Sequence, residues 1–192
     1  MKPREPFEAV VAGCSAGGLK ALHVFLSGLT SDLPVPVVVV AHTGTEDIST
    51  MCDLLSRSSA LPVAEAQERH VLRPGCVYLA PTGYHLYIER DFRFSLSIDD
   101  KVCYVRPSID VLFQSAADAL GSRVVAVVMT GANEDGAAGL RAVRGRGGIG
   151  IVQDPQDAEV PSMPAAALAL AGADYCVSLT GIAPLVNELC RR

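Results

Sequence analysis

Short apolar runs alternate with helical patterns along almost the whole chain. The apolar runs, which we expect to be strands, cover Ala9–Ala12, Val35–Ala41, Cys76–Ala80, Val124–Met129, Gly148–Gln153 and Tyr175–Ser178. Helices are expected over Leu19–Ser27, Asp47–Ser58, Ile109–Leu120, Ala137–Arg146, Pro164–Ala171 and Ile182–Leu189. Most of the expected strands are apolar at every position, which is typical of strands covered on both faces. The alternation therefore predicts an α/β protein with three α/β/α layers and a mainly parallel, doubly wound sheet.

One segment departs from this alternation. The runs Tyr84–Glu89 and Phe92–Ile98 are separated only by Arg90 and Asp91, and the second run alternates apolar with polar residues. This pattern predicts an antiparallel β-hairpin with one face toward water. The chain shows no internal repeat, low-complexity tract or linker, so we expect residues 1–192 to form a single domain.

Composition narrows the classes of function. Hydrophobic residues make up 49% of the 192 residues and the net charge is -5, so the chain is globular and has no basic footprint for nucleic acid or an anionic membrane surface. The first residues lack the apolar core of a signal peptide, and no apolar stretch approaches the roughly 20 residues that span a bilayer. We therefore expect a cytoplasmic protein without nucleic-acid partners or membrane insertion. The oligomeric state stays open.

The cysteines do not form a recognisable metal-binding or disulfide framework. They are scattered, without CxxC pairs or histidines at zinc spacing: Cys14, Cys52, Cys76, Cys103, Cys176 and Cys190. We expect reduced, buried thiols, with Cys14 filling space under the turn that follows the first strand. No metal and no cofactor are expected.

Polar residues that could take part in catalysis follow three of the expected strands. Ser15 follows the first strand inside the small-residue stretch 13–18, His42 follows the second, and Asp135 lies in the loop 130–136 after Val124–Met129. Residues at the carboxyl ends of parallel strands meet at one edge of a sheet. The small residues permit a sharp turn that holds the serine above the strand end, and free helix N–H groups would point to the same spot. The sequence thus predicts a serine nucleophile beside an oxyanion site.

Each of these features also has a simpler interpretation. The glycine-rich turn could bind a phosphate, although no Walker lysine follows it and no acidic residue ends the second strand. His42 alone could be a structural histidine, and Asp135 or Glu134 alone could be a charge at a helix N-terminus. It is their convergence at neighbouring strand ends that favours catalysis.

Several motifs in one order make the chain resemble a known family. They are Gly13–Gly18, the strand ending in His42, Val77–Pro81 followed by His85, Arg106–Phe113, Thr130–Gly131 with Asp135–Gly139, and Gln153–Pro155 with Pro161–Pro164. Together they resemble the catalytic domain of the chemotaxis-type protein-glutamate methylesterases over nearly the whole chain. The resemblance implies hydrolysis of glutamate γ-methyl esters on helical chemoreceptor-type proteins with release of methanol, and often deamidation of glutamines there.

The resemblance also implies roles for residues. By matching motif, Ser15 would be the nucleophile, His42 the general acid/base and Asp135 the residue that orients His42. The backbone N–H groups of Ala16 and Ala132 would hold the developing oxyanion. Familiar members carry threonine and methionine at these two alanines, and an alanine keeps the N–H, so the departures concern substrate fit and rate.

The chain departs from the family pattern at other positions as well. Thr43–Gly44 stand where a proline is familiar, and Asn133 stands where glycine is common. Asp110 follows a helix start with Ser108 as its cap, so a structural role is expected for it. His85 is expected to be only a hydrogen-bonding strand residue. Many family members carry an N-terminal receiver domain, for which this chain leaves no room before its first strand.

Two other functions remain compatible with the same residues. A serine esterase acting on small molecules would use the same triad. A catalytically weak adaptor would bind receptor helices through the same cleft.

Overall fold

The computed structural model describes residues 5–42 and 47–191, and its elements follow the apolar pattern closely. The strands are β1 (Ala9–Cys14), β2 (Val37–Ala41), β3 (Val63–Glu65), β4 (Val77–Leu79), β5 (His85–Ile88), β6 (Phe94–Ser97), β7 (Val124–Val128), β8 (Ile149–Gln153) and β9 (Tyr175–Val177). The helices are α1 (Gly18–Ser27), α2 (Ile48–Ser56), α3 (Ile109–Leu120), α4 (Ala137–Gly145), α5 (Ser162–Ala171) and α6 (Leu179–Cys190), with a short 3-10 turn at Gly121–Arg123. The departure at Thr43–Gly44 lies outside the described residues.

The main sheet is parallel and has β1 near its middle. Within the described residues its strand order is β3-β4-β2-β1-β7-β8-β9, and Gly13 on β1 is in register with Val40 on β2 and Val128 on β7. The chain winds outward from β1 to β2 on one side and returns to β7 on the other. Because parallel strands share one carboxyl edge, the residues after β1, β2 and β7 lie together at this reversal point.

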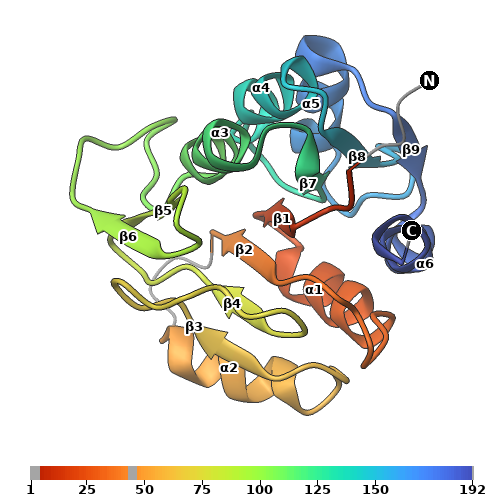
Figure 1. Ribbon diagram of the computed structural model, residues 1–192. Helices are drawn as coiled ribbons and strands as arrows, with labels where there is room; N and C mark the ends of the chain where they lie inside the picture. Colours follow the sequence, from red (N-terminus) through yellow and green to blue (C-terminus); the bar gives the residue numbers. More distant parts are fainter. Residues whose placement is uncertain (1–4, 43–46, 192) are drawn as a thin grey trace.

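Helices cover both faces of the sheet, as expected for three layers (Figure 1). Val10 and Ala12 on β1 pack into a core with α1, α2 and α6, whereas Ala9 and Val11 pack into a second core with α3, α4 and α5. This alternation follows from the two-residue period of a strand. It confirms the predicted α/β/α fold with a doubly wound sheet.

The β-hairpin is present, but its turn is longer than expected. Phe92 was predicted to be on the apolar face; instead it has φ 60° in the turn, and its N–H donates to the Glu89 carbonyl at 3.0 Å. Ile98, predicted on the same face, lies beyond β6 and is 72% exposed. Phe94 is the buried contact of β6, with its ring 5.0 Å from that of Tyr78. The hairpin buries one side against the α3 layer.

Strand β3 was not predicted. It is a three-residue edge strand whose central residue Ala64 is exposed, so it lacks a continuous apolar run.

The cysteines are free, as expected, but only Cys14, Cys52 and Cys190 are buried, and Cys176 is exposed on the edge strand β9. The expectation of uniformly buried thiols was therefore wrong. None of the described helices has both the length and the apolarity that crossing a bilayer requires.

Candidate active site

A sharp turn carries Ser15 from β1 into α1. Gly17 adopts φ 76°, and a Cβ at Gly18 would lie 2.7 Å from Cys14 Sγ, so the turn needs residues without side chains. The Ser15 N–H donates to the Thr130 carbonyl at 2.9 Å, which ties the turn to the end of β7. Cys14 is fully buried, and burial raises the pKa of its thiol to about 12. It therefore stays a neutral packing residue under the turn, as expected.

Ser15 and His42 line the same open pocket. The pocket has a volume of about 460 Å³, and Ala16, Lys20 and Glu159 also line it. The His42 N–H donates to the Cys14 carbonyl at 3.0 Å, so the backbone that carries the imidazole is fixed against the end of β1. The structure thus brings the predicted hydroxyl and imidazole to one place at the carboxyl edge of the sheet.

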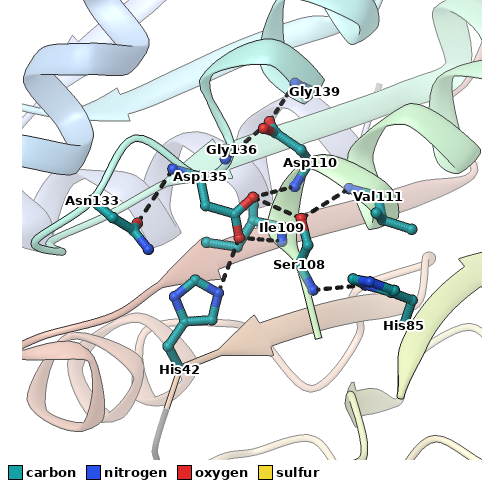
Figure 2. A network of polar contacts seen from close by, with 10 residues as sticks. All are labelled: His42, His85, Ser108, Ile109, Asp110, Val111, Asn133, Asp135, Gly136 and Gly139. Carbon is teal, nitrogen blue, oxygen red and sulfur yellow. Dashed lines mark hydrogen bonds and ion pairs between the residues drawn. The ribbon is translucent and has the colours of Figure 1, made fainter. Parts of the chain in front are cut away.

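His42 also contacts Asp135. Its Nε2 lies 3.0 Å from Asp135 Oδ2, and the two side chains are 10% and 0% exposed (Figure 2). The contact is close without being a well-aligned hydrogen bond. Nδ1 is also buried and has no hydrogen-bond partner among the described residues, so Ser15 and His42 share a pocket here without a hydrogen bond between their side chains.

The N-terminus of α3 holds the Asp135 carboxylate. Oδ1 accepts hydrogen bonds from Ser108 Oγ at 2.7 Å and from the Asp110 N–H at 3.0 Å, and Oδ2 accepts one from the Ile109 N–H at 2.7 Å. Burial is the largest single influence and raises the pKa of Asp135, but the hydrogen bonds from His42 and the α3 terminus together outweigh it and lower the pKa. Asp135 is therefore an anion at neutral pH, as a residue that orients a histidine must be.

Asp110 in turn accepts hydrogen bonds from the N-terminus of α4. Its Oδ1 accepts hydrogen bonds from the N–H groups of Gly136 at 2.9 Å and Gly139 at 2.6 Å. Burial, followed by the charge of Asp135, raises the pKa of Asp110 against the lowering effect of these hydrogen bonds. Asp135, which precedes α4, thus binds the N-terminus of α3, and Asp110, in the first turn of α3, binds the N-terminus of α4 (Figure 2). The expected structural role of Asp110 is confirmed.

Neither the backbone N–H of Ala16, next to Ser15, nor that of Ala132, in the loop after β7, has a hydrogen-bond partner within the described residues. Ala16 lines the Ser15 pocket, and its carbonyl accepts a hydrogen bond from Thr130 Oγ1 at 2.9 Å. Ala132 is exposed in the loop after β7, next to Gly131, whose N–H donates to the Val160 carbonyl at 3.1 Å. Thr130 therefore joins the two segments that carry these N–H groups.

Several residues support the site through contacts that no sequence pattern indicated. Thr130 Oγ1 also accepts from the Val160 N–H at 2.9 Å, and Gln153 Oε1 accepts from the Thr130 N–H at 2.9 Å. His85 is buried at the start of β5, and its Nδ1 accepts from the Ser108 N–H at 3.2 Å. The available signal was the position of Thr130 and Gln153 at strand ends, whereas no local pattern links His85 to Ser108.

Among the residues that the structure describes, one group of possible metal ligands lies beside the site. One ligand atom each of Cys103, Asp110 and Asp135 falls within 4.8 Å of the others. Because both carboxylates already accept backbone N–H groups, this donor set suits helix termini better than a cation. We assign no metal role to it.

A serine, a histidine and an aspartate at neighbouring strand ends of a parallel α/β sheet are the arrangement on which serine hydrolases are built. The family comparison is more specific. The profile of the CheB methylesterase family matches residues 10–186, and the chain belongs to that family.

Relatives and a solved structure agree with this assignment. A Leptospira interrogans protein, provisionally named a protein-glutamate methylesterase/protein-glutamine glutaminase, is 41% identical over 183 residues, which are 95% of each chain. The protein-glutamate methylesterase/protein-glutamine glutaminase 2 of Methanospirillum hungatei is 36% identical over 188 residues, 98% of this chain and 54% of that protein. The crystal structure of the CheB methylesterase catalytic domain of Thermotoga maritima matches with a TM-score of 0.92 and 32% identity, over 96% of this chain and 100% of that one.

Proposed function

We propose that this protein is a protein-glutamate methylesterase that hydrolyses glutamate γ-methyl esters on chemoreceptor-type proteins, releases methanol, and deamidates glutamines at such sites. The names of its relatives support the substrate class. The observation that carries the chemistry is the 3.0 Å contact between His42 Nε2 and the buried Asp135 carboxylate, beside a pocket that His42 shares with Ser15.

The proposed mechanism is acyl transfer through Ser15. The Ser15 hydroxyl attacks the ester carbonyl while His42 takes its proton, and the N–H groups of Ala16 and Ala132 stabilise the oxyanion. His42 then returns the proton to the departing methanol, and water activated by His42 hydrolyses the acyl-enzyme. With a glutamine substrate the same steps release ammonia. Asp135 orients the imidazole and stabilises its protonated form.

The proposal includes a cellular setting. The partner is a methylated, helical chemoreceptor-type protein, and the chain acts in the cytoplasm as part of signal transduction. Residues 1–192 act as one catalytic domain, which is consistent with a single main sheet whose two covering layers run through the described residues.

Ser15→Ala tests this function most directly. The variant should lose methanol release from methylated receptor by at least about 10³-fold, because removal of a catalytic serine abolishes acyl transfer. Its circular dichroism and urea unfolding should match those of the wild type. Ser27→Ala is the matched control, since this exposed serine lies at the far end of α1 and should leave the rate unchanged.

Three other results would change the assignment. Unchanged methanol release by Ser15→Ala would refute the mechanism. Hydrolysis of small methyl esters that is as efficient as that of the receptor would instead indicate a general esterase. Tight receptor binding without fluorophosphonate labelling of Ser15 would indicate an adaptor.

A further inference from the structure

A continuous chain of buried polar contacts leads from the β-hairpin to the catalytic histidine. His85 at the start of β5 contacts Ser108, Ser108 contacts Asp135, and Asp135 contacts His42 (Figure 2). The three distances are 3.2, 2.7 and 3.0 Å. His85, Ser108 and Asp135 are each at most 1% exposed, so water does not compete for these contacts.

The partners of His85 determine which of its nitrogens carries the proton. The Ser108 N–H donates to Nδ1, which must therefore be unprotonated. Nε2 lies 3.0 Å from the carbonyl oxygen of Asp100, an acceptor only, so Nε2 carries the hydrogen. Both sides of the ring are used, and the imidazole is held between the loop at Asp100 and the beginning of α3.

Ser108 connects the His85 imidazole to the active site. Its Oγ donates to Asp135, and the next two residues, Ile109 and Asp110, donate their N–H groups to the same carboxylate. A shift of the Ser108 backbone therefore moves all three donors that hold Asp135 from α3. Misplacement of a catalytic group by about 1 Å costs on the order of 10²-fold in rate.

We propose that His85 is a positioning residue of the esterase site, which by accepting the Ser108 N–H fixes the α3 terminus that holds Asp135 against His42. The inference rests on the proposed function. His85 does not line the pocket of Ser15 and His42, so it acts on the reaction only through Ser108 and Asp135. The β-hairpin thereby becomes part of the catalytic architecture.

Two substitutions separate positioning from packing. In His85→Asn the amide oxygen stands near the place of Nδ1 and can accept the Ser108 N–H, while the bond to Asp100 is lost. In His85→Gln the amide nitrogen can reach the Asp100 carbonyl, while the acceptor for Ser108 is lost. Each variant removes one buried hydrogen bond, so urea unfolding should show similar losses of stability for both.

The two variants should differ in rate. We expect kcat for methanol release to stay within about threefold of the wild type in His85→Asn and to fall about 10- to 100-fold in His85→Gln, with KM unchanged. The rate of fluorophosphonate labelling of Ser15 should follow the same order. Equal rates in the two variants, or rates that follow only their stabilities, would overturn the proposal.

Labelling also distinguishes this inference from the proposed function. If the wild type labels at Ser15 but releases no methanol from methylated receptor, the substrate proposal fails and the difference in labelling between the two variants still decides the role of His85. A wild type that neither labels nor releases methanol would overturn both.

Ser108→Ala tests the route from His85 to Asp135 in a double-mutant cycle with His85→Gln. This variant keeps the N–H toward His85 but removes the hydroxyl bond to Asp135. If His85 acts through Ser108, the loss of kcat caused by His85→Gln should be smaller in the Ser108→Ala background than in the wild type. Strictly additive losses would contradict the proposed route.

Discussion

At the scale of single residues, Asp135 shows how a fully buried carboxylate keeps its charge. Three donors from the α3 terminus and the contact with His42 compensate the cost of removing it from water. Asp110, a few ångströms away, has the opposite balance, because burial and the charge of Asp135 raise its pKa. The contributions of the two carboxylates to folding stability therefore change with pH in opposite directions.

Asp135→Asn should expose this difference in stability. Because the folded pKa of Asp135 lies below the unfolded value of about 3.9, its ionised form stabilises the fold above that pH, and this contribution is lost as the pH falls through the folded pKa. The stability deficit of Asp135→Asn relative to the wild type should thus be largest near about pH 7 and shrink toward about pH 2. Urea unfolding across this range measures it.

Asp110→Asn is the matched control for that series. Its raised folded pKa means that the contribution of Asp110 is fully present below the unfolded value and is lost as the pH rises through the folded pKa. The amide oxygen can still accept from Gly136 and Gly139. Asp110→Asn should therefore gain on the wild type as the pH rises, and a deficit of Asp135→Asn that is constant with pH would contradict the assignment.

At the scale of elements, α3 and α4 lie close enough for Asp135 to accept hydrogen bonds from the N-terminus of α3 and for Asp110 to accept them from the N-terminus of α4. Gly139 in the first part of α4 leaves space for α3, since a Cβ there would lie 2.6 Å from Phe113 Cβ and 3.0 Å from the Asp110 Cα. Its N–H also donates to Asp110 Oδ1 at 2.6 Å, beside the N–H of Gly136. The same residue therefore determines helix packing and helix capping.

Gly139→Ala should destabilise the protein although alanine is the better helix former. Overpacking against α3 costs about 1–3 kcal/mol, which exceeds the helix propensity gained. Gly145→Ala in the same helix meets open space and should be neutral or stabilise by up to about 1 kcal/mol. The free energy of urea unfolding of both variants measures this difference, and equal values would show that the helices do not pack as closely as described.

At the scale of the whole molecule, the distance between the sheet and the α3 layer determines where Asp135 lies relative to Ser15 and His42. Gly13 on the central strand β1 faces the start of α3, and a Cβ there would overlap Ile109 Cγ2. Ile109 in turn donates its N–H to Asp135. The sheet that carries Ser15 and the helix that holds Asp135 are therefore in contact at a glycine.

Gly13→Ala should lower both stability and rate. Displacing Ile109 should cost roughly 1–3 kcal/mol and move the donors of Asp135, so kcat for methanol release should fall by about tenfold or more. Val125→Ala is the control, because this buried residue of β7 packs into the opposite core with α1 and α6. It should cost similar stability and leave kcat unchanged. Comparable losses of rate in the two variants would refute the contact as a determinant of activity.

The apolar pattern predicted most elements because strand and helix periodicity is written locally in the chain. The bounds of α3 are those expected, Ile109–Leu120, and the expected strand at Tyr175–Ser178 differs from β9 by one residue. The pattern could not predict β3, since a short edge strand with an exposed centre lacks a continuous apolar run. It also placed Phe92 and Ile98 on the hairpin face, because alternation does not reveal where a turn ends.

The sequence by itself determined the fold class and the three residues at the strand ends, because the carboxyl ends of parallel strands meet wherever such a sheet forms. Only the tertiary structure decided which groups hold those residues. Ser108 lies 27 residues from Asp135, and His85 lies 23 residues from Ser108. Their contacts depend on how α3 and the hairpin lie against the sheet, and that arrangement follows from packing of both cores and not from any local pattern.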